Sequence, residues 1–589
     1  MKIKSLARWK DLANLEGLLF FAQRIDEMVF DYSLDSYKPP ALNAPYLCKE
    51  AIALIGDIED KRIDEANLKH VLEELQWSLS LDPVAKSLLD LEPSQYFTLE
   101  DNAKLPSRKL KLEVLERTLN PARYLEECQK QLYLAVVENK KNKIETVLRC
   151  YVTALINGKL SKNLIADRIQ EIFFNDDGSL IDSPKVLNYF FESVFPYSHE
   201  FEVYFVVNNL INKVKDSLKA FNIEIVESLG ENLSEFAIDN KFSKSDKEVY
   251  LKVSGLRGLD IYTAREKAER KLDNLSDLFM IFSHKTQISW NEKTLVTQCC
   301  RDSPIVIGKP RSSMEKGFDS RPQVASKKLN TFIRKFRVNH ESFERFNRVV
   351  DLHGISLIND IPENQLLNIW IGLETITPTH IGNTKINEIV TALMPFFMLD
   401  YCNRIVRNLA FDLTRWNRKV TRKLLNKLPV DSSVKITHKV LQLICTSEGD
   451  SILSEFYSEL DDFPLLRYRL FSLSKLFESP NSVAKFLSTH EKKVAWQIRR
   501  IYRTRNIIVH SGRPPGFIHS LIENAHDYLD QVVSSYITLT CDDYKADTIE
   551  QSFEIMKMKW RKYESELSKL DKFEKNNFDF LVSSSINYN

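Results

Sequence analysis

The part of the chain from residue 326 to 572 consists almost entirely of segments with helical periodicity. Apolar residues recur there every three or four positions, which gives each predicted helix one apolar stripe. Packing such helices side by side in an antiparallel bundle buries all the stripes together, so the sequence predicts a mainly α protein with a C-terminal helical bundle. The predicted helices are Lys327 to Phe336, Glu341 to Asp351, Glu363 to Thr375, Ile386 to Trp416, His438 to Cys445, Ser451 to Leu460, Leu465 to Phe477, Ser482 to Ser511, Phe517 to Ile537 and Ala546 to Leu570.

Residues 1–196 are predicted to be helical as well. Apolar stripes run from Leu15 to Met28 and from Leu68 to Leu79, and Cys128 to Ile156 is a candidate for one long helix. No residues in this part have a spacing that indicates catalysis. We therefore interpret it as a helical recognition or regulatory region.

The segment 197–306 has a different pattern, in which strands alternate with helices. Its order of strand, helix, strand, strand, helix, strand is that of a small α+β domain of the ferredoxin-like type. A loose α+β connector that packs on the C-terminal region explains the pattern equally well. The predicted strands are Phe201 to Val207, Ile223 to Val226, Glu248 to Val253 and Gln287 to Val296, with helices at Leu210 to Phe221 and Thr263 to Phe282.

Residues 307–325 are rich in Gly, Pro, Ser and charge, which indicates a linker or a mobile loop. Basic side chains in and near such a loop can instead contact RNA, although basic loops are common. Residues 573–589 are interpreted as a C-terminal tail. The candidate RNA-contacting residues are Lys309, Arg311, Lys316, Arg321 and Arg513.

Composition restricts the classes of partner. The 589 residues, 43% of them hydrophobic, suffice for two to four domains, and 82 basic residues face 81 acidic ones, so a nucleic-acid site has to be a local patch. The eight cysteines are scattered and lack metal-ligand spacing. We therefore expect reduced thiols, a cytoplasmic location, no metal site and no cofactor. Because no signal peptide and no apolar stretch of membrane-spanning length is present, we expect no membrane partner.

The segment from Glu491 to Gly512, EKKVAWQIRRIYRTRNIIVHSG, has the most specific pattern in the chain. It is predicted to be one amphipathic helix that stops at Gly512. At about 100° per residue, residues spaced by four, three and four positions share one face. This polar stripe consists of Arg499, Arg503, Asn506 and His510, with Arg505 beside it.

Two interpretations of this stripe remain open. Arginines can hold a phosphate bidentately, and histidine can move a proton near neutral pH, so the stripe suits a metal-free site that cleaves phosphodiesters. A basic stripe is, however, usually a solvated helix face. A histidine at the C-terminal end of a helix often only complements the helix dipole.

Residues 505–510, RNIIVH, resemble the R-N-x-x-x-H motif of HEPN ribonucleases, and QIRRIYRTRNIIVHSG resembles the motif helix of the ApeA-like HEPN branch, found in bacterial anti-phage proteins. Two further strings resemble the same branch. Leu366 to Ile376, LLNIWIGLETI, is similar to its first helix, and Leu465 to Leu473, LLRYRLFSL, is similar to the segment before the motif helix. The resemblance covers the last 250 residues or so and implies a HEPN-type bundle.

The resemblance implies a metal-independent endoribonuclease. In RNA the 2′-hydroxyl attacks the adjacent phosphodiester, so a site needs a group that orients or deprotonates this hydroxyl and groups that neutralise the phosphate. His510 is expected to act on the hydroxyl, Arg505 to hold the phosphate, and Asn506 to fix the phosphate or the imidazole. Glu374 is expected to support Arg499 or Arg503, a role that we favour over proton transfer.

HEPN bundles pair with their motif helices face to face. Arg505 and His510 lie about 140° apart around an ideal helix, so a cleft shared by two copies brings them together more readily than one helix does. The resemblance therefore implies a homodimer or a larger even assembly. It also implies an anti-phage, abortive-infection effector with tRNA as one candidate substrate and a phage-derived trigger. Gly512 stands where some HEPN toxins have a modified tyrosine, which argues against regulation by a paired antitoxin.

Two classes of protein compete with the ribonuclease. One is a HEPN-like module that binds RNA, nucleotides or a protein partner without cutting. The other is a helical adaptor whose basic stripe binds an acidic protein, which would leave Asn506 and His510 without a task. The complete R-N-x-x-x-H string favours the enzyme.

Overall fold

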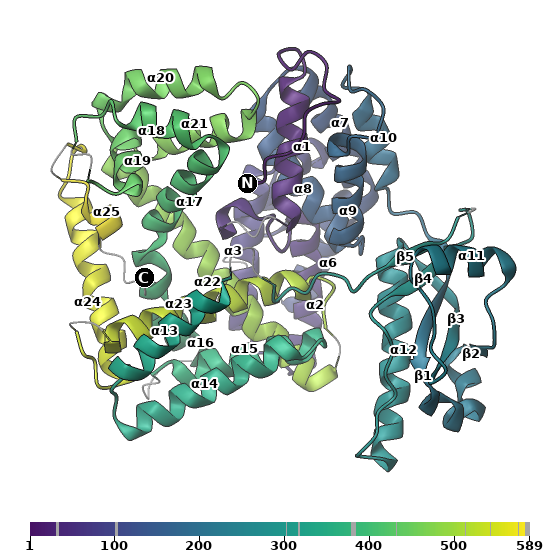
Figure 1. The fold of residues 1–589 in the computed structure, drawn as a ribbon. Helices are drawn as coiled ribbons and strands as arrows, with labels where there is room; N and C mark the ends of the chain where they lie inside the picture. Colours follow the sequence, from purple (N-terminus) through teal and green to yellow (C-terminus); the bar gives the residue numbers. More distant parts are fainter. Residues whose placement is uncertain are drawn as a thin grey trace. The chain divides into compact units, whose positions relative to one another are not determined.

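The structure is a computed structural model, and it describes residues 1–30, 34–99, 104–301, 303–315, 319–378, 385–430, 433–512, 514–541, 544–574 and 577–583. The chain forms two compact units. The larger consists of residues 1–153, 179–184 and 313–589, and the smaller of residues 154–178 and 185–312. Figure 1 shows the helices of the first unit and the sheet of the second.

The first part of the larger unit is helical, as predicted. Proline at the first or second helical position recurs in it, where the missing N–H group costs nothing. Its elements are α1 (Glu16–Phe30), η1 (Asp35–Tyr37), α2 (Ala44–Glu59), α3 (Ala66–Leu81), α4 (Pro83–Leu88), α5 (Pro93–Tyr96), α6 (Leu105–Thr118), α7 (Pro121–Val137) and α8 (Lys141–Asn157), the last of which continues into the smaller unit.

The C-terminal part of the larger unit is a packed set of helices. Among them α15 contacts α14, α22 and α23, and α16 contacts α22, α23 and α24 (Figure 1). The elements are α13 (Pro322–Lys335), α14 (His340–Ile358), α15 (Pro362–Ile376), α16 (Lys385–Leu399), α17 (Tyr401–Trp416), α18 (Arg418–Leu425), α19 (Ile436–Cys445), η4 (Ser447–Gly449), α20 (Asp450–Glu459), α21 (Pro464–Leu476), α22 (Pro480–Ser511), α23 (Ile518–Cys541), α24 (Ile549–Ser568) and α25 (Phe580–Ser583).

Two predicted helices are wrong in length. The expected helix from Ile386 to Trp416 is divided into α16 and α17 at Asp400, and the expected helix from Cys128 to Ile156 is divided into α7 and α8 around Asn139, which has a φ of 52°. In both cases apolar residues continue on either side of the turn, so periodicity alone does not reveal it. The short helix α18 was not predicted.

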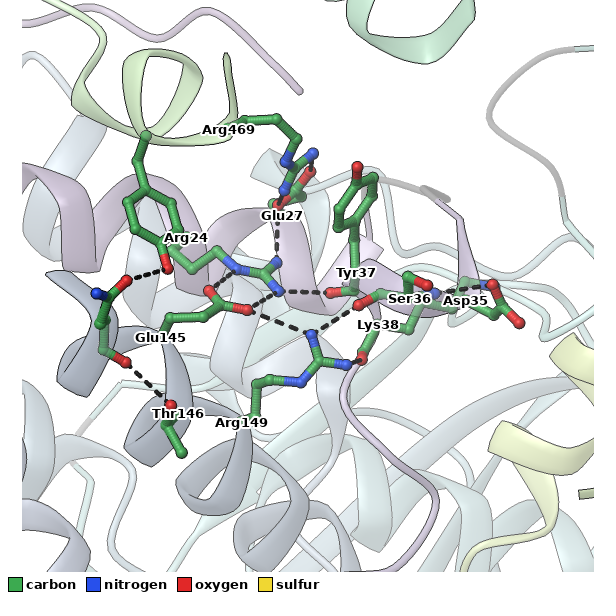
Figure 2. Close-up of polar contacts among 12 residues, drawn as sticks. Arg24, Glu27, Asp35, Ser36, Tyr37, Lys38, Glu145, Thr146, Arg149 and Arg469 are labelled. Atoms are coloured by element: carbon green, nitrogen blue, oxygen red, sulfur yellow. Dashed lines mark hydrogen bonds and ion pairs between the residues drawn. The ribbon is translucent and has the colours of Figure 1, made fainter. Parts of the chain in front are cut away.

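Buried ion pairs connect the N-terminal helices to the C-terminal ones. Arg469 of α21 donates to both carboxylate oxygens of Glu27 on α1, at 2.8 and 2.7 Å, and Arg24 of α1 donates to Glu27 at 2.7 Å. Arg24 also bonds Glu145 of α8 and the carbonyl of Tyr37. Figure 2 shows this network, in which Arg24 lies between the two carboxylates.

The compact units differ from the expected domains. The expected boundary at residue 196 separates a helical region from the rest, whereas residues 1–153 belong to the same unit as the C-terminal helices. The expected linker 307–325 contains the end of β5 and the beginning of α13, and residues 316–318 lie outside the described residues. Of the predicted tail, residues 575–576 and 584–589 also lie outside them.

The smaller unit contains a five-stranded antiparallel sheet with the order β2-β3-β1-β4-β5. Strands β1, β2 and β3 match three of the predicted strands. The fourth, expected from Gln287 to Val296, is displaced, because β4 begins only at Thr294 and ends at Gln298, and β5 is an addition. The elements are α9 (Lys162–Ile169), η2 (Gln170–Phe174), α10 (Val186–Ser193), β1 (His199–Asn208), η3 (Asn209–Phe221), β2 (Ile223–Val226), α11 (Glu231–Asp239), β3 (Glu248–Gly258), α12 (Ile261–Phe282), β4 (Thr294–Gln298) and β5 (Ile305–Ile307).

Both faces of this sheet are covered. Phe205 of β1 and Leu251 of β3 pack with Leu272 of α12 on one face, and Tyr204 and Val206 of β1 pack on the other face with residues of the α11 region. Successive residues of β1 thus enter different cores, as the two-residue period of a strand requires. This unit therefore has a hydrophobic core of its own.

One stretch, Lys385 to Trp416, is long and apolar enough to cross a membrane by length and composition. Its most apolar window is 78% buried inside the structure, and the stretch is interrupted at Asp400. Such burial is typical of a core helix in a helical bundle.

Candidate functional site

The segment with the R-N-x-x-x-H string forms the second half of α22, a helix of 32 residues. The side chain of Ser479 caps its N-terminus by accepting from the backbone N–H of Ser482, and Pro480 follows the cap. Gly512 ends the helix with a φ of 64° and donates its N–H to the carbonyl of Ile508 at 2.8 Å. The expected helix and its stop are confirmed.

The middle of α22 is fixed by a buried network of opposite charges. Arg500, which is 1% exposed, donates to Glu50 of α2 at 3.0 Å and also to Glu74 of α3. Arg503, which is 4% exposed, donates to the other oxygen of Glu50 at 2.8 Å. One carboxylate thus connects two arginines on successive turns of the helix.

The pKa values of the two carboxylates move in opposite directions. Burial alone would raise the pKa of Glu50, but the charges and hydrogen bonds of Arg500 and Arg503 outweigh it and lower the pKa to about 2. Burial raises the pKa of Glu74, and the charge and hydrogen bond of Arg500 offset only part of that effect. Glu50 is therefore the ionised centre of the network.

The predicted polar stripe does not face solvent as a whole. Arg503 is buried in its ion pair, and Arg499 is half-buried with its Nη2 donating to Asn387 at 3.3 Å. Asn506 is half-buried and His510 is exposed. The side chains of the stripe are thus buried in ion pairs in the middle of α22 and become exposed to solvent toward its C-terminal end.

The last turns of α22 hold the residues of the R-N-x-x-x-H string. Arg505 is half-buried and donates from Nη1 to Oδ1 of Asn506 at 3.0 Å. The imidazole of His510 has no hydrogen bond or ion pair with any residue that the structure describes. Arg505 and Asn506 thus form a pair, and His510 lies free of them at the helix end.

Three arginines of α22 each keep one buried guanidinium nitrogen without a hydrogen-bond partner among the described residues. These nitrogens are Nε of Arg499, Nη1 of Arg503 and Nε of Arg505. Leaving a buried donor unsatisfied costs about 1–3 kcal/mol, and more when it is charged. An anion or ordered water beside this helix would remove that cost.

The prediction that Glu374 supports Arg499 or Arg503 is wrong. Glu374 lies on α15 and forms an ion pair with Lys385, at 3.1 Å, rather than with Arg499 or Arg503. The helices themselves do meet, because Trp370 of α15 lies 5.6 Å from Tyr502 of α22 between ring centroids. The supporting carboxylates come instead from Glu50 and Glu74, which no motif or spacing in the sequence connects to α22.

The predicted basic loop is divided between the two units. Lys309 and Arg311 belong to the smaller unit, and Arg321 precedes α13 in the larger one. Lys316 and Arg513 lie outside the described residues.

His70 of α3 is a further polar neighbour of α22. Burial lowers its pKa, and the charge of Arg499 lowers it further. No spacing in the sequence connects residue 70 to residue 499, so only the structure identifies this neighbour.

Comparisons with known proteins found no matching family model, no similar curated protein and no similar solved structure.

Proposed function

We propose that this protein is a metal-independent endoribonuclease of the HEPN type that cleaves RNA through attack of the 2′-hydroxyl on the adjacent phosphodiester. The observation that carries the proposal is the exposed imidazole of His510 at the end of α22, with the Arg505–Asn506 pair just before it on the same helix. An exposed general base can reach a polymer substrate, and a helix held by buried ion pairs keeps it in place.

In this mechanism His510 orients or deprotonates the 2′-hydroxyl, and Arg505 holds the scissile phosphate. Asn506 fixes the guanidinium through the hydrogen bond that it accepts from Arg505. DNA lacks the internal nucleophile, so such a site spares it.

The proposal includes a homodimer, or a larger even assembly, that brings two copies of α22 together. Val509, next to His510, is 54% exposed, which provides apolar surface at the end of α22 for contact with a second copy. An isologous contact there would bring Arg505 of one copy near His510 of the other. The resemblance to anti-phage HEPN proteins extends the proposal to a cytoplasmic abortive-infection effector with a phage-derived trigger and tRNA among its candidate substrates.

The strand order of the smaller unit supports a ferredoxin-like identity for it. Strand β1 lies between β3 and β4, and β2 pairs with β3, while α12 covers one face. This identity alone indicates no activity.

The first experiment incubates purified protein with total RNA, with and without a chelator. Wild type is expected to cut in both conditions, and His510→Ala and Arg505→Ala are each expected to lose about 10²-fold or more in rate. Lys492→Ala, an exposed change on the same helix, is the matched control and should cut normally. If a trigger is required, the same variants are compared by their toxicity in cells.

The outcomes separate the competing classes. RNA binding without cutting would favour the non-catalytic module, and cutting that persists in His510→Ala would refute the proposed site. Binding to an acidic protein without RNA binding would favour the adaptor.

A second experiment tests the shared cleft by mixing the two inactive variants. If Arg505 of one copy works with His510 of the other, a mixed dimer contains one intact site, so random mixing restores about a quarter of wild-type activity. Mixing that restores nothing would show that each copy needs both residues.

A further inference from the structure

Two helices of the larger unit bring two imidazoles and a carboxylate to one point. His353 lies on α14, and His526 and Asp530 lie on α23. Residues four apart lie on the same face of a helix, so His526 and Asp530 point together toward α14. No part of the proposed RNA site uses these residues.

The three ligand atoms form a small triangle. The Nε2 atoms of His353 and His526 are 3.1 Å apart. Oδ1 of Asp530 is 3.3 Å from Nε2 of His353, and its Oδ2 is 3.6 Å from Nε2 of His526. The bond lengths of about 2.0–2.1 Å between zinc and nitrogen place two tetrahedral ligands about 3.3 Å apart, so the triangle has the size of one coordination shell.

The hydrogen bond between the two rings limits how many protons the cluster can hold. Two Nε2 atoms that face each other can share only one hydrogen, so one ring has to present a lone pair. The carboxylate lies close to both rings, with one oxygen near each Nε2 atom, so the three side chains place their ligand atoms around one point. Convergent lone pairs of two neutral imidazoles and a carboxylate are what a divalent transition-metal ion binds.

The surroundings also suit a metal ion. The side chain of His526 is 4% exposed, whereas those of His353 and Asp530 are each 30% exposed. The site thus has one buried ligand and remains open to solvent on the other side. Three protein ligands leave at least one coordination position for water or another small ligand.

We propose that His353, His526 and Asp530 bind a divalent first-row transition-metal ion, for which Zn²⁺ is the representative probe. The ion joins α14 to α23 and keeps an open coordination position. This site is independent of the proposed ribonuclease, whose chemistry needs no metal.

A second cluster supplies the internal comparison. His199, Cys299 and Cys300 of the smaller unit also bring ligand atoms close together, and Cys299 and Cys300 are exposed. A thiolate bound to Co²⁺ produces an intense charge-transfer band, whereas imidazole and carboxylate ligands do not. Co²⁺ spectra therefore show which cluster is occupied.

The test titrates the chelator-treated full-length protein with Co²⁺ and then displaces it with Zn²⁺. We expect visible d–d bands without a thiolate band, stoichiometric binding, and a fall in affinity of about tenfold or more in His353→Ala and in Asp530→Asn. Both changed side chains are partly exposed, and circular dichroism checks that the variants fold. Excess Zn²⁺ should raise the melting temperature of wild type more than that of either variant.

Two controls sharpen the result. The double variant Cys299→Ser/Cys300→Ser should bind as wild type does. So should His438→Ala, which removes a different histidine–carboxylate pair, with Asp579 at 3.2 Å. Absence of binding by wild type, unchanged affinity in the two ligand variants, or a thiolate band that disappears in the cysteine variant would each overturn the proposal.

Discussion

At the scale of the residue, Glu50 of the larger unit connects two buried arginines of α22. Replacing it with the neutral amide in Glu50→Gln leaves Arg503 without its carboxylate partner in a buried position and leaves Arg500 with Glu74 alone. Breaking a buried pair in this way typically costs about 3–5 kcal/mol. We expect a loss of that order in the free energy of unfolding, measured by denaturant titration.

Glu65→Gln is the matched control for this change. Glu65 is exposed just before α3, so its replacement should alter stability by less than about 0.5 kcal/mol. Equal losses in the two variants would mean that the buried network adds no more to the free energy of unfolding than an exposed carboxylate does.

Sequence reasoning found the basic residues of α22 but not their partners. It grouped Arg499 with Arg503 by helical spacing, which is correct for a helix, but it could not tell that Arg503 is buried against Glu50 while His510 is exposed. No rule of spacing connects Arg500 to residues 50 and 74, so the sequence pattern does not indicate that it is buried in ion pairs. The same limit applies to the candidate metal site, since His353 and His526 are 173 positions apart.

At the scale of the element, the end of α22 depends on Gly512. Its φ of 64° lies in the left-handed region, where a Cβ costs about 1 kcal/mol, although, apart from its chain neighbours, no described residue has an atom within 4 Å of that Cβ position. Gly512→Ala should therefore lower stability by about 1 kcal/mol. It should also lower the rate of RNA cleavage, even at temperatures where the variant is fully folded, because His510 lies two residues before the cap.

Gly56→Ala in α2 is the control for this prediction. Gly56 lies inside a helix with open space at its Cβ position, so alanine there should stabilise the protein by up to about 1 kcal/mol. Thermal melts of both variants give the comparison. A stabilising effect at both positions would contradict the role assigned to the left-handed cap.

The packing of α22 on α17 predicts a dependence on pH. His490 of α22 stacks on Tyr401 of α17, with ring centroids 3.5 Å apart. Burial lowers the pKa of His490 to about 4, only partly offset by Asp35. At pH 6.5 the histidine is thus neutral in the folded protein but readily protonated in the unfolded chain. Its contribution to the free energy of unfolding is therefore fully present above about pH 6.5, and this contribution is lost as the pH falls toward 4.

Between about pH 6.5 and pH 4, the free energy of unfolding is expected to fall by on the order of 3 kcal/mol because of this histidine. Melting temperatures between pH 7 and 4 should fall less steeply in His490→Gln than in wild type. His284→Gln, at an exposed histidine of the smaller unit, should leave the slope unchanged. Identical slopes in all three proteins would show that His490 is not the titrating group.

Helices and strands were more predictable than their junctions. The predicted helix from Ser482 to Ser511 matches α22 to within two residues, because its apolar period, its cap and its glycine stop agree. The division at Asp400 was missed, since apolar residues flank it on both sides. Local pattern thus identifies an element, and the turns that redirect it depend on contacts from elsewhere in the chain.

At the scale of the molecule, the sequence predicts an N-terminal domain separate from the C-terminal bundle. The contacts instead place residues 1–153 in the same compact unit as the C-terminal helices. The connecting pairs join positions far apart in the sequence, such as Glu27 with Arg469 and Glu50 with Arg500. Burial would raise the pKa of Glu27, yet Arg469 and Arg24 together lower it, so the carboxylate is ionised inside the unit. Composition and periodicity do not contain such pairings.

This arrangement makes a prediction about fragments. A fragment of residues 313–589 lacks Glu27 and Glu50, so it should leave Arg469, Arg500 and Arg503 unpaired beside newly exposed apolar surface. Unpaired charges of this kind cost several kcal/mol each, which together is comparable to the whole stability of a domain. We expect the fragment to show no cooperative unfolding transition by circular dichroism.

Adding residues 1–153 in trans should restore a cooperative transition, because the same ion pairs can form between two chains. Residues 154–312, which contain the sheet and its covering helices, should unfold cooperatively by themselves, since that core is complete without the larger unit. A fragment of residues 313–589 that melts alone at the temperature of the full chain would contradict this. In that case the bundle would be an independent domain, as the sequence first suggested, and the buried arginines would have to find other partners within it.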